Sequence, residues 1–198
     1  MKDKRFANRG LQLEEFVRFA NRMYAKRGFA VIEKLPTEFL PIRDRRGNVA
    51  SVKVEHKSKV DFIGRLRNIP IAIEAKHTKD ASIRFDRVEQ HQALYMDAFT
   101  AEPGTIGLVL ISFGLQRFFA VPWQFWRDAM IARGADRAAC VTSEHFGVSW
   151  DIPHKMSVRA DELDPVWEVC GTHRTFGLHY LENAERWIEQ PKPENLCV

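Results

Sequence analysis

Apolar side chains recur at helical spacing near the N-terminus and predict an amphipathic helix over about residues 10 to 27. The apolar residues at this spacing are Leu13, Phe16, Val17, Ala20, Met23 and Tyr24, and Gly28 supplies a stop signal. A short strand is then expected over residues 29–32, because prolines at positions 36 and 41 interrupt a longer one.

The segment 43–59 is strongly basic, and apolar and polar residues alternate within it from position 49 to position 54. Arg46, Gly47 and Asn48 predict a turn in front of this alternation. The pattern indicates a basic β-ribbon that protrudes from the core.

Two further strands are expected over residues 60–64 and 69–76. Isoleucines at positions 69, 71 and 73 alternate, so Ala72, Glu74 and Lys76 share the opposite face of the second strand. Helical spacing returns over 85–99, and the apolar run 106–111 predicts a buried central strand. Another strand is expected over 118–121, before a helix that begins at Pro122. This order predicts an α/β fold in which helices flank a mixed β-sheet.

Beyond Gly134 the periodicity weakens. A strand over 145–151, a short helical segment over 161–169 and a helix over 181–189 are expected there, with a frayed tail from Pro191. We therefore expect one domain followed by a C-terminal extension.

The composition is that of a globular protein, because 45% of the 198 residues are hydrophobic and 28% are charged. No apolar run approaches the roughly 18 residues that span a bilayer. No secretory signal is visible, and three scattered cysteines make no disulfide framework. These features predict a cytoplasmic protein in a reducing compartment, with no membrane as a partner.

The charge is divided unevenly along the chain. Residues 1–100 contain 21 Lys and Arg against 13 Asp and Glu, whereas residues 101–198 contain 9 against 13. A basic half in a protein of net charge +4 indicates a polyanionic partner bound by one face. A solvated basic surface is the alternative.

The candidate chemistry lies on the strands around Asp61 and Glu74. Carboxylates on adjacent strands can hold a divalent cation through hard oxygen ligands. Lys76, on the face of Glu74, can orient or deprotonate a water or stabilise negative charge, which suits attack on a phosphodiester. The three residues resemble the active-site pattern of the PD-(D/E)xK nucleases. A second Glu-x-Lys, at Glu55 with Asp44 upstream, lies in a charged run that a solvated ribbon explains, whereas Glu74 ends an apolar strand.

A longer set of motifs runs in order from about residue 6 to residue 165. It consists of Asn8-Arg9-Gly10 followed by Leu13-Glu14, Lys34-Leu35-Pro36-Thr37, Asp61, Glu74-Ala75-Lys76, the His91-Gln92 pair and the segment 157–163. In these motifs the chain resembles the RecU-type Holliday junction resolvases, a branch of the PD-(D/E)xK superfamily.

The resemblance implies a restriction-endonuclease-like nuclease domain over 1–165. It also implies a homodimer that resolves four-way DNA junctions by paired Mg²⁺-dependent nicks in recombination and repair, with Mn²⁺ as a substitute. Asp61, Glu74 and the Ala75 carbonyl would then ligate the metal. Lys76 would be the catalytic lysine, Gln92 would position water or phosphate, and Glu14 would be a further acidic member of the site. Cleavage would leave 5′-phosphate and 3′-hydroxyl ends.

By the same resemblance, the ribbon 43–59 corresponds to a stalk that enters the junction centre. The residues expected to contact DNA phosphates are Arg9, Arg43, Arg45, Arg46, Lys53, Lys57 and Lys59. The implied partners are branched DNA, a second copy of the chain, and a recombination helicase or recombinase.

The chain departs from the family in a shorter stalk and in an extension over 166–198 that has no counterpart and no assigned role. Both departures fit a phage- or prophage-borne relative with altered junction preference. Three other functions stay open. They are a nickase or restriction-like nuclease on linear DNA, a DNA-architectural protein without catalysis, and a scaffold that binds a protein through the aromatic C-terminal half.

Overall fold

The computed structural model describes residues 4–36, 38–44, 46, 48–56, 58–132, 142–145, 148–151 and 155–184. Its centre is a six-stranded sheet in the order β1-β4-β5-β7-β8-β12. The two central strands β5 (Ile69–Thr78) and β7 (Ile106–Phe113) are parallel, and the other pairs of this sheet are antiparallel. The expected mixed sheet is confirmed.

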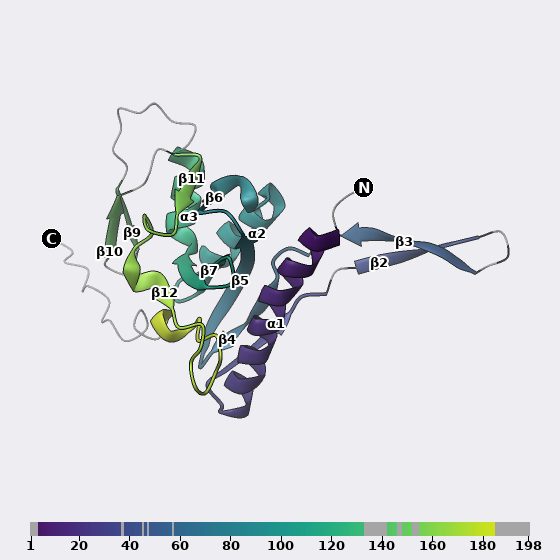
Figure 1. Ribbon diagram of the computed structural model, residues 1–198, viewed down its shortest axis with the longest axis horizontal. Coiled ribbons are helices and arrows are strands. Elements are labelled where there is room, and N and C mark those ends of the chain that lie inside the picture. The colour runs from purple at the N-terminus through teal and green to yellow at the C-terminus, as the bar shows by residue number, and fades with distance from the viewer. Residues whose placement is uncertain are drawn as a thin grey trace.

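Helices flank this sheet (Figure 1). Helix α1 (Lys4–Lys26) packs against β1 (Ala30–Lys34) and β5, whereas α2 (Gln90–Thr100) and α3 (Trp123–Ala132) pack against β7. Strand β7 is therefore buried at each of its positions, as its apolar sequence predicts. The prediction of an α/β fold is confirmed.

A two-stranded ribbon projects away from this core (Figure 1). It is formed by β2 (Glu38–Arg43) and β3 (Val49–His56), which pair antiparallel with register shifts at both ends. The ribbon stands between β1 and β4 (Phe62–Leu66) in the chain, so its base adjoins the edge of the central sheet.

Most element boundaries differ from the sequence prediction by one or two residues, and three elements differ by more. Helix α1 begins at Lys4, earlier than expected. The helix expected over 85–99 begins at Gln90, because residues Phe85–Arg87 form a 3-10 turn and Glu89 closes a capping box with Gln92. The strand expected over 145–151 is instead a hairpin of β9 (Thr142–His145) and β10 (Val148–Asp151).

The helical segment expected over 161–169 was wrong. Asp164 accepts the Val166 N–H and caps a 3-10 turn over Pro165–Trp167, and the chain then extends as β12 (Glu168–Val169). Strand β12 pairs with β8 (Arg117–Pro122) at the edge of the sheet, and this pairing overrides the helical spacing. A third two-stranded sheet joins β6 (Ser82–Arg84) to β11 (Ser157–Arg159).

The segment after β12 folds back onto the C-terminal half of α1 (Figure 1). Rings from both ends of the chain form one aromatic cluster there. Tyr24 contacts Phe29, Phe176, His179 and Tyr180, and Phe29 also contacts Phe176 and His179. Most of the helix expected over 181–189, and the tail from Pro191, lie outside the described residues. Within the described ranges, no helix is both long enough and apolar enough to span a membrane.

Candidate active site

Asp61 is held at the start of β4 by two main-chain contacts. Its carbonyl oxygen accepts the Leu35 N–H at 2.9 Å, which ties it to the end of β1. Its side-chain Oδ2 accepts the Ala75 N–H of β5 at 2.8 Å. The two neighbouring strands therefore fix both the backbone and the carboxylate of Asp61.

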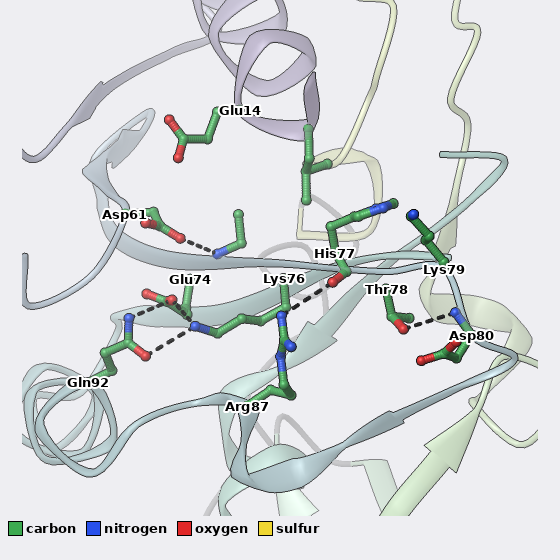
Figure 2. A pocket seen from close by; sticks show the side chains of 12 residues that line it. Glu14, Asp61, Glu74, Lys76, His77, Thr78, Lys79, Asp80, Arg87 and Gln92 are labelled. Carbon is green, nitrogen blue, oxygen red and sulfur yellow. Dashed lines mark hydrogen bonds and ion pairs between the residues drawn. The ribbon is translucent and has the colours of Figure 1, made fainter. Parts of the chain in front are cut away.

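Glu74, Lys76 and Gln92 form one hydrogen-bonded group beside Asp61 (Figure 2). Glu74 is 1% exposed, and its Oε1 lies 2.6 Å from Lys76 Nζ and accepts from Gln92 Nε2 at 2.6 Å. Lys76 Nζ also donates to Gln92 Oε1 at 3.2 Å. The alternation of β5 puts the acid and the lysine on one face, as the sequence predicts, and α2 lies against them on that face.

The capping box of α2 fixes the orientation of the Gln92 amide. Gln92 Oε1 accepts the Glu89 N–H at 2.9 Å, so its amide nitrogen is the atom that faces Glu74. The first turn of a helix thus presents a donor to the carboxylate and an acceptor to the lysine.

Burial leaves the two carboxylates short of compensating positive charge. Burial, with the neighbouring charge of Asp61, raises the pKa of Glu74 from 4.5 to about 7 against the opposing effect of Lys76. Burial likewise raises the pKa of Asp61, although the Ala75 N–H and Lys76 lower it. A cation placed between the two groups would stabilise both charged forms.

The donor atoms fit a hard divalent cation. Glu74 Oε2 is buried and has no hydrogen-bond partner within the part of the chain that the structure describes. The Ala75 carbonyl lies on the same edge of β5 as the N–H that Asp61 binds, because a strand residue directs both groups to one side. Among the described residues no group of three or more His, Cys, Asp or Glu side chains is placed to hold a metal. Two carboxylates and a carbonyl, completed by water and phosphate oxygens, still suit Mg²⁺.

Glu14 lies on α1 above Asp61 (Figure 2), and its charge raises the pKa of Asp61. Its own carboxylate is bonded by Lys34 Nζ, and Arg18 Nη2 lies 3.9 Å away. No local sequence pattern indicates the contact between Lys34 and Glu14, because it depends on β1 packing beside α1.

One cavity of about 530 Å³ holds the candidate site (Figure 2). Its lining includes Glu14, Asp61, Glu74, Ala75, Lys76 and Gln92. Its other end, past Lys76, is lined by His77, Thr78, Lys79, Asp80 and Arg87. No sequence motif includes Lys79, Asp80 or Arg87, so no sequence pattern pointed to these three residues.

The residues expected to contact DNA are placed less completely. Arg43 and Arg46 are exposed on the ribbon. Lys59 is exposed at its base, with Nζ 5.7 Å from the centre of the Tyr95 ring. Arg45 and Lys57 lie outside the described residues, and for Arg9 and Lys53 only the backbone is described.

Known proteins match this chain over much of its length. The sequence model of Recombination protein U (RecU) matches residues 8–182. A Holliday junction resolvase RecU of Streptococcus pneumoniae (strain Taiwan19F-14) is 32% identical over 120 residues, which are 58% of this chain and 60% of that protein. One from Lactobacillus delbrueckii subsp. bulgaricus (strain ATCC BAA-365 / Lb-18) is 27% identical over 143 residues, or 65% of this chain and 68% of that protein. The chain therefore spans less than two thirds of the pneumococcal relative.

A solved structure of Hjc, a Holliday junction resolvase from Archaeoglobus fulgidus, aligns with a TM-score of 0.35 and 12% identity over 55% of this chain and 78% of that chain. A similarity this low adds no weight to the assignment. The RecU match, by contrast, extends from the first turns of α1 to residue 182, past the boundary at 165 that the motifs indicate. On this match the chain belongs to the Recombination protein U family.

Proposed function

We propose that this protein is a Mg²⁺-dependent endonuclease that resolves four-way DNA junctions by paired nicks in recombination and repair. The observation that carries the proposal is the group formed by Asp61, Glu74 and Lys76 at the end of β5. A buried and a half-buried carboxylate with raised pKa values, beside a lysine, are costly in a core and suit phosphodiester hydrolysis.

Asp61, Glu74 and the Ala75 carbonyl would hold the cation. When bound, Mg²⁺ would supply Lewis-acid polarisation of the scissile phosphate and a water of lowered pKa. Mn²⁺ is expected to substitute for it. Lys76 is held by Glu74 and Gln92 so that its ammonium group faces the cavity, where it can contact the attacking water and the charge that develops on the phosphate.

In the proposed reaction the oxygen of water bonds to phosphorus while the bond from phosphorus to the 3′ oxygen breaks. One proton of the water passes, by way of solvent, to the departing 3′ oxygen, and the other stays on the new phosphate group or passes to bulk water, which leaves 5′-phosphate and 3′-hydroxyl ends. Gln92 positions Lys76 in this scheme, and Glu14 completes the acidic rim from α1.

The ribbon supports a four-way junction as the substrate. It projects beyond the core beside the edge strand β1, where a branched DNA could surround it (Figure 1). Its exposed Arg43 and Arg46 would contact phosphates. Two symmetric nicks need two active sites, so we expect a homodimer. A helicase or recombinase partner and a cytoplasmic place of action stay predictions.

The proposal is tested on a labelled four-way junction and the matching linear duplex, each with Mg²⁺. We expect paired nicks in the junction alone, and no nicks with Asp61→Asn or Glu74→Gln. Glu102→Gln, an exposed acid in a turn away from the cavity, should cleave like the wild type. Mg²⁺ should also raise the melting temperature of the wild type and of Glu102→Gln, but not of Glu74→Gln, because a ligand stabilises only a protein that binds it.

Equal cleavage of the duplex would keep the active site and exclude junction selectivity, in favour of a nickase or restriction-like nuclease. Tight junction binding without cleavage in Mg²⁺ or Mn²⁺ would contradict the enzyme and indicate an architectural protein.

A further inference from the structure

The cavity that holds the candidate active site continues past Lys76 to a second, cationic end (Figure 2). Arg87, on the 3-10 turn before α2, reaches into this end from below β5. The proposed chemistry uses the opposite end, around Asp61 and Glu74, so it leaves Arg87 without a function.

The Arg87 guanidinium makes little use of its donors. Its Nη2 donates to the His77 carbonyl at 3.4 Å, a long contact to a neutral acceptor. Within the described residues no carboxylate lies within ion-pair distance of it, and the side chain is exposed. A guanidinium offers five N–H donors, so most of those of Arg87 face the cavity or solvent.

Arg84, on the same segment, shows the alternative arrangement. Its Nε donates to Asp86 Oδ1 at 3.0 Å, and its Nη2 donates to Asp86 Oδ2. Asp86 is thus occupied by Arg84 and not by Arg87, although it lies next to Arg87 in sequence. Asp86 therefore compensates the charge of Arg84, outside the cavity, and leaves the charge of Arg87, inside the cavity, without a neighbouring acid.

A phosphate is the anion that this position suits. A DNA strand carries a phosphate at every nucleotide, so a strand whose scissile phosphate lies beside Asp61 and Glu74 extends further phosphates along the cavity. Arg87 contacts the carbonyl of His77, which follows Lys76 on β5. The guanidinium group therefore lies one residue further along β5 than the lysine of the proposed site. Planar guanidinium groups bind phosphates through two parallel hydrogen bonds.

We propose that Arg87 binds the phosphate next to the scissile one and thereby positions the DNA strand across the active site. This inference rests on the proposed nuclease function. It makes Arg87 a positioning residue of the substrate and assigns it no part in bond breaking.

The first test compares Arg87→Gln with Arg84→Gln, which removes the same charge three residues away. We expect Arg87→Gln to lower kcat/KM on the junction about tenfold or more, as for loss of a charged hydrogen bond. The slope of log K for junction binding against log salt concentration should decrease in magnitude by about one, as expected for the loss of one phosphate contact. Arg87→Lys should restore the salt slope and only part of kcat/KM, because it keeps the charge and loses the bidentate geometry. Arg84→Gln should match the wild type.

The second test places single uncharged methylphosphonate linkages in the junction, one position at a time around the nick, and measures binding in EDTA. At one position next to the nick, the neutral linkage should weaken junction binding by the wild type and by Arg84→Gln about tenfold. It should leave junction binding by Arg87→Gln unchanged. Equal losses in all three proteins at every linkage would overturn the inference. Cleavage plays no part in this assay, so the coupling can be present while the nuclease proposal fails, or absent while Glu74→Gln still shows a working nuclease.

Discussion

Gln92 is the residue that connects the carboxylate of the site to its lysine. Its oxygen already accepts the Glu89 N–H of the capping box, so its amide cannot turn over without losing that bond. The same orientation gives Glu74 a donor and Lys76 an acceptor. The start of a helix therefore determines the geometry of a group on a strand.

Gln92→Ala should lower junction cleavage about tenfold to hundredfold, because it removes a hydrogen bond to a charged group on each side of the site. The measurement is kcat for nicking at saturating DNA and Mg²⁺. Gln90→Ala on the same helix turn, where the side chain is exposed, should keep the wild-type rate. A Gln92→Ala protein that nicks like Gln90→Ala would exclude a positioning role.

The core of the candidate site could be predicted from residue order, but its surroundings could not. Alternation along β5 is enough to place Glu74 and Lys76 on one face, since strand side chains repeat every two residues. The contacts of Lys34 to Glu14 and of Arg87 to His77 join segments that no local pattern relates. These depend on how elements pack, and periodicity carries no information about that.

At the scale of elements, the pairing of β1 with β4 carries the site. Ile32 lies opposite Gly64 in this pair, and the Leu35 N–H beyond the end of β1 holds Asp61. A Cβ built at Gly64 would lie 2.0 Å from the Val31 carbonyl oxygen, which is backbone and cannot move aside alone. Glycine is therefore required for the two strands to approach.

Gly64→Ala should lower the melting temperature by several degrees, as expected when overpacking costs about 1 to 3 kcal/mol of unfolding free energy. Cleavage should fall with it, because separating β1 from β4 shifts Asp61. Val31→Ala, a truncation on the same strand pair at a side chain that is 43% exposed, is the control and should change the melting temperature much less. A Gly64→Ala protein as stable as Val31→Ala would show that the sheet edge can adjust.

Long periodic elements were predictable and the short ones were not. Strands β5 and β7 and helix α1 carry enough apolar positions to show their period. Strand β12 has two residues, and its pairing with Phe119 and Phe118 of β8 makes it a strand. Such short pairings follow from the sheet that is already present rather than from local preference.

At the scale of the whole molecule, the segment 170–184 ties the end of the described chain to its first helix. The Tyr180 hydroxyl donates to Asn21 Oδ1, and His179 Nδ1 lies 3.0 Å from the Tyr24 hydroxyl. Since α1 also carries Glu14 to the rim of the candidate site, loosening the contacts between the segment 170–184 and α1 should move that rim. The stability of the contacts between the segment 170–184 and α1 is thus linked to the candidate site at the other end of the helix.

The contacts between the segment 170–184 and α1 should make the free energy of unfolding depend on pH through His179, which is 8% exposed. Burial and the charge of His173 lower the pKa of His179 below its usual 6.5, against the opposing effect of Glu182. The unfolded chain therefore takes up this proton at a higher pH than the folded protein does. The stabilisation is complete above pH 6.5 and is lost as the pH falls through that value toward the lower pKa of the folded state.

The pH dependence of stability is measured as free energies of unfolding from urea titrations at several pH values between 5 and 8. His179→Asn, which can keep the contact to Tyr24 but does not titrate, should show a flatter profile than the wild type. If His179→Asn loses as much stability as the wild type between pH 7.5 and 5.5, the acid sensitivity arises from another group.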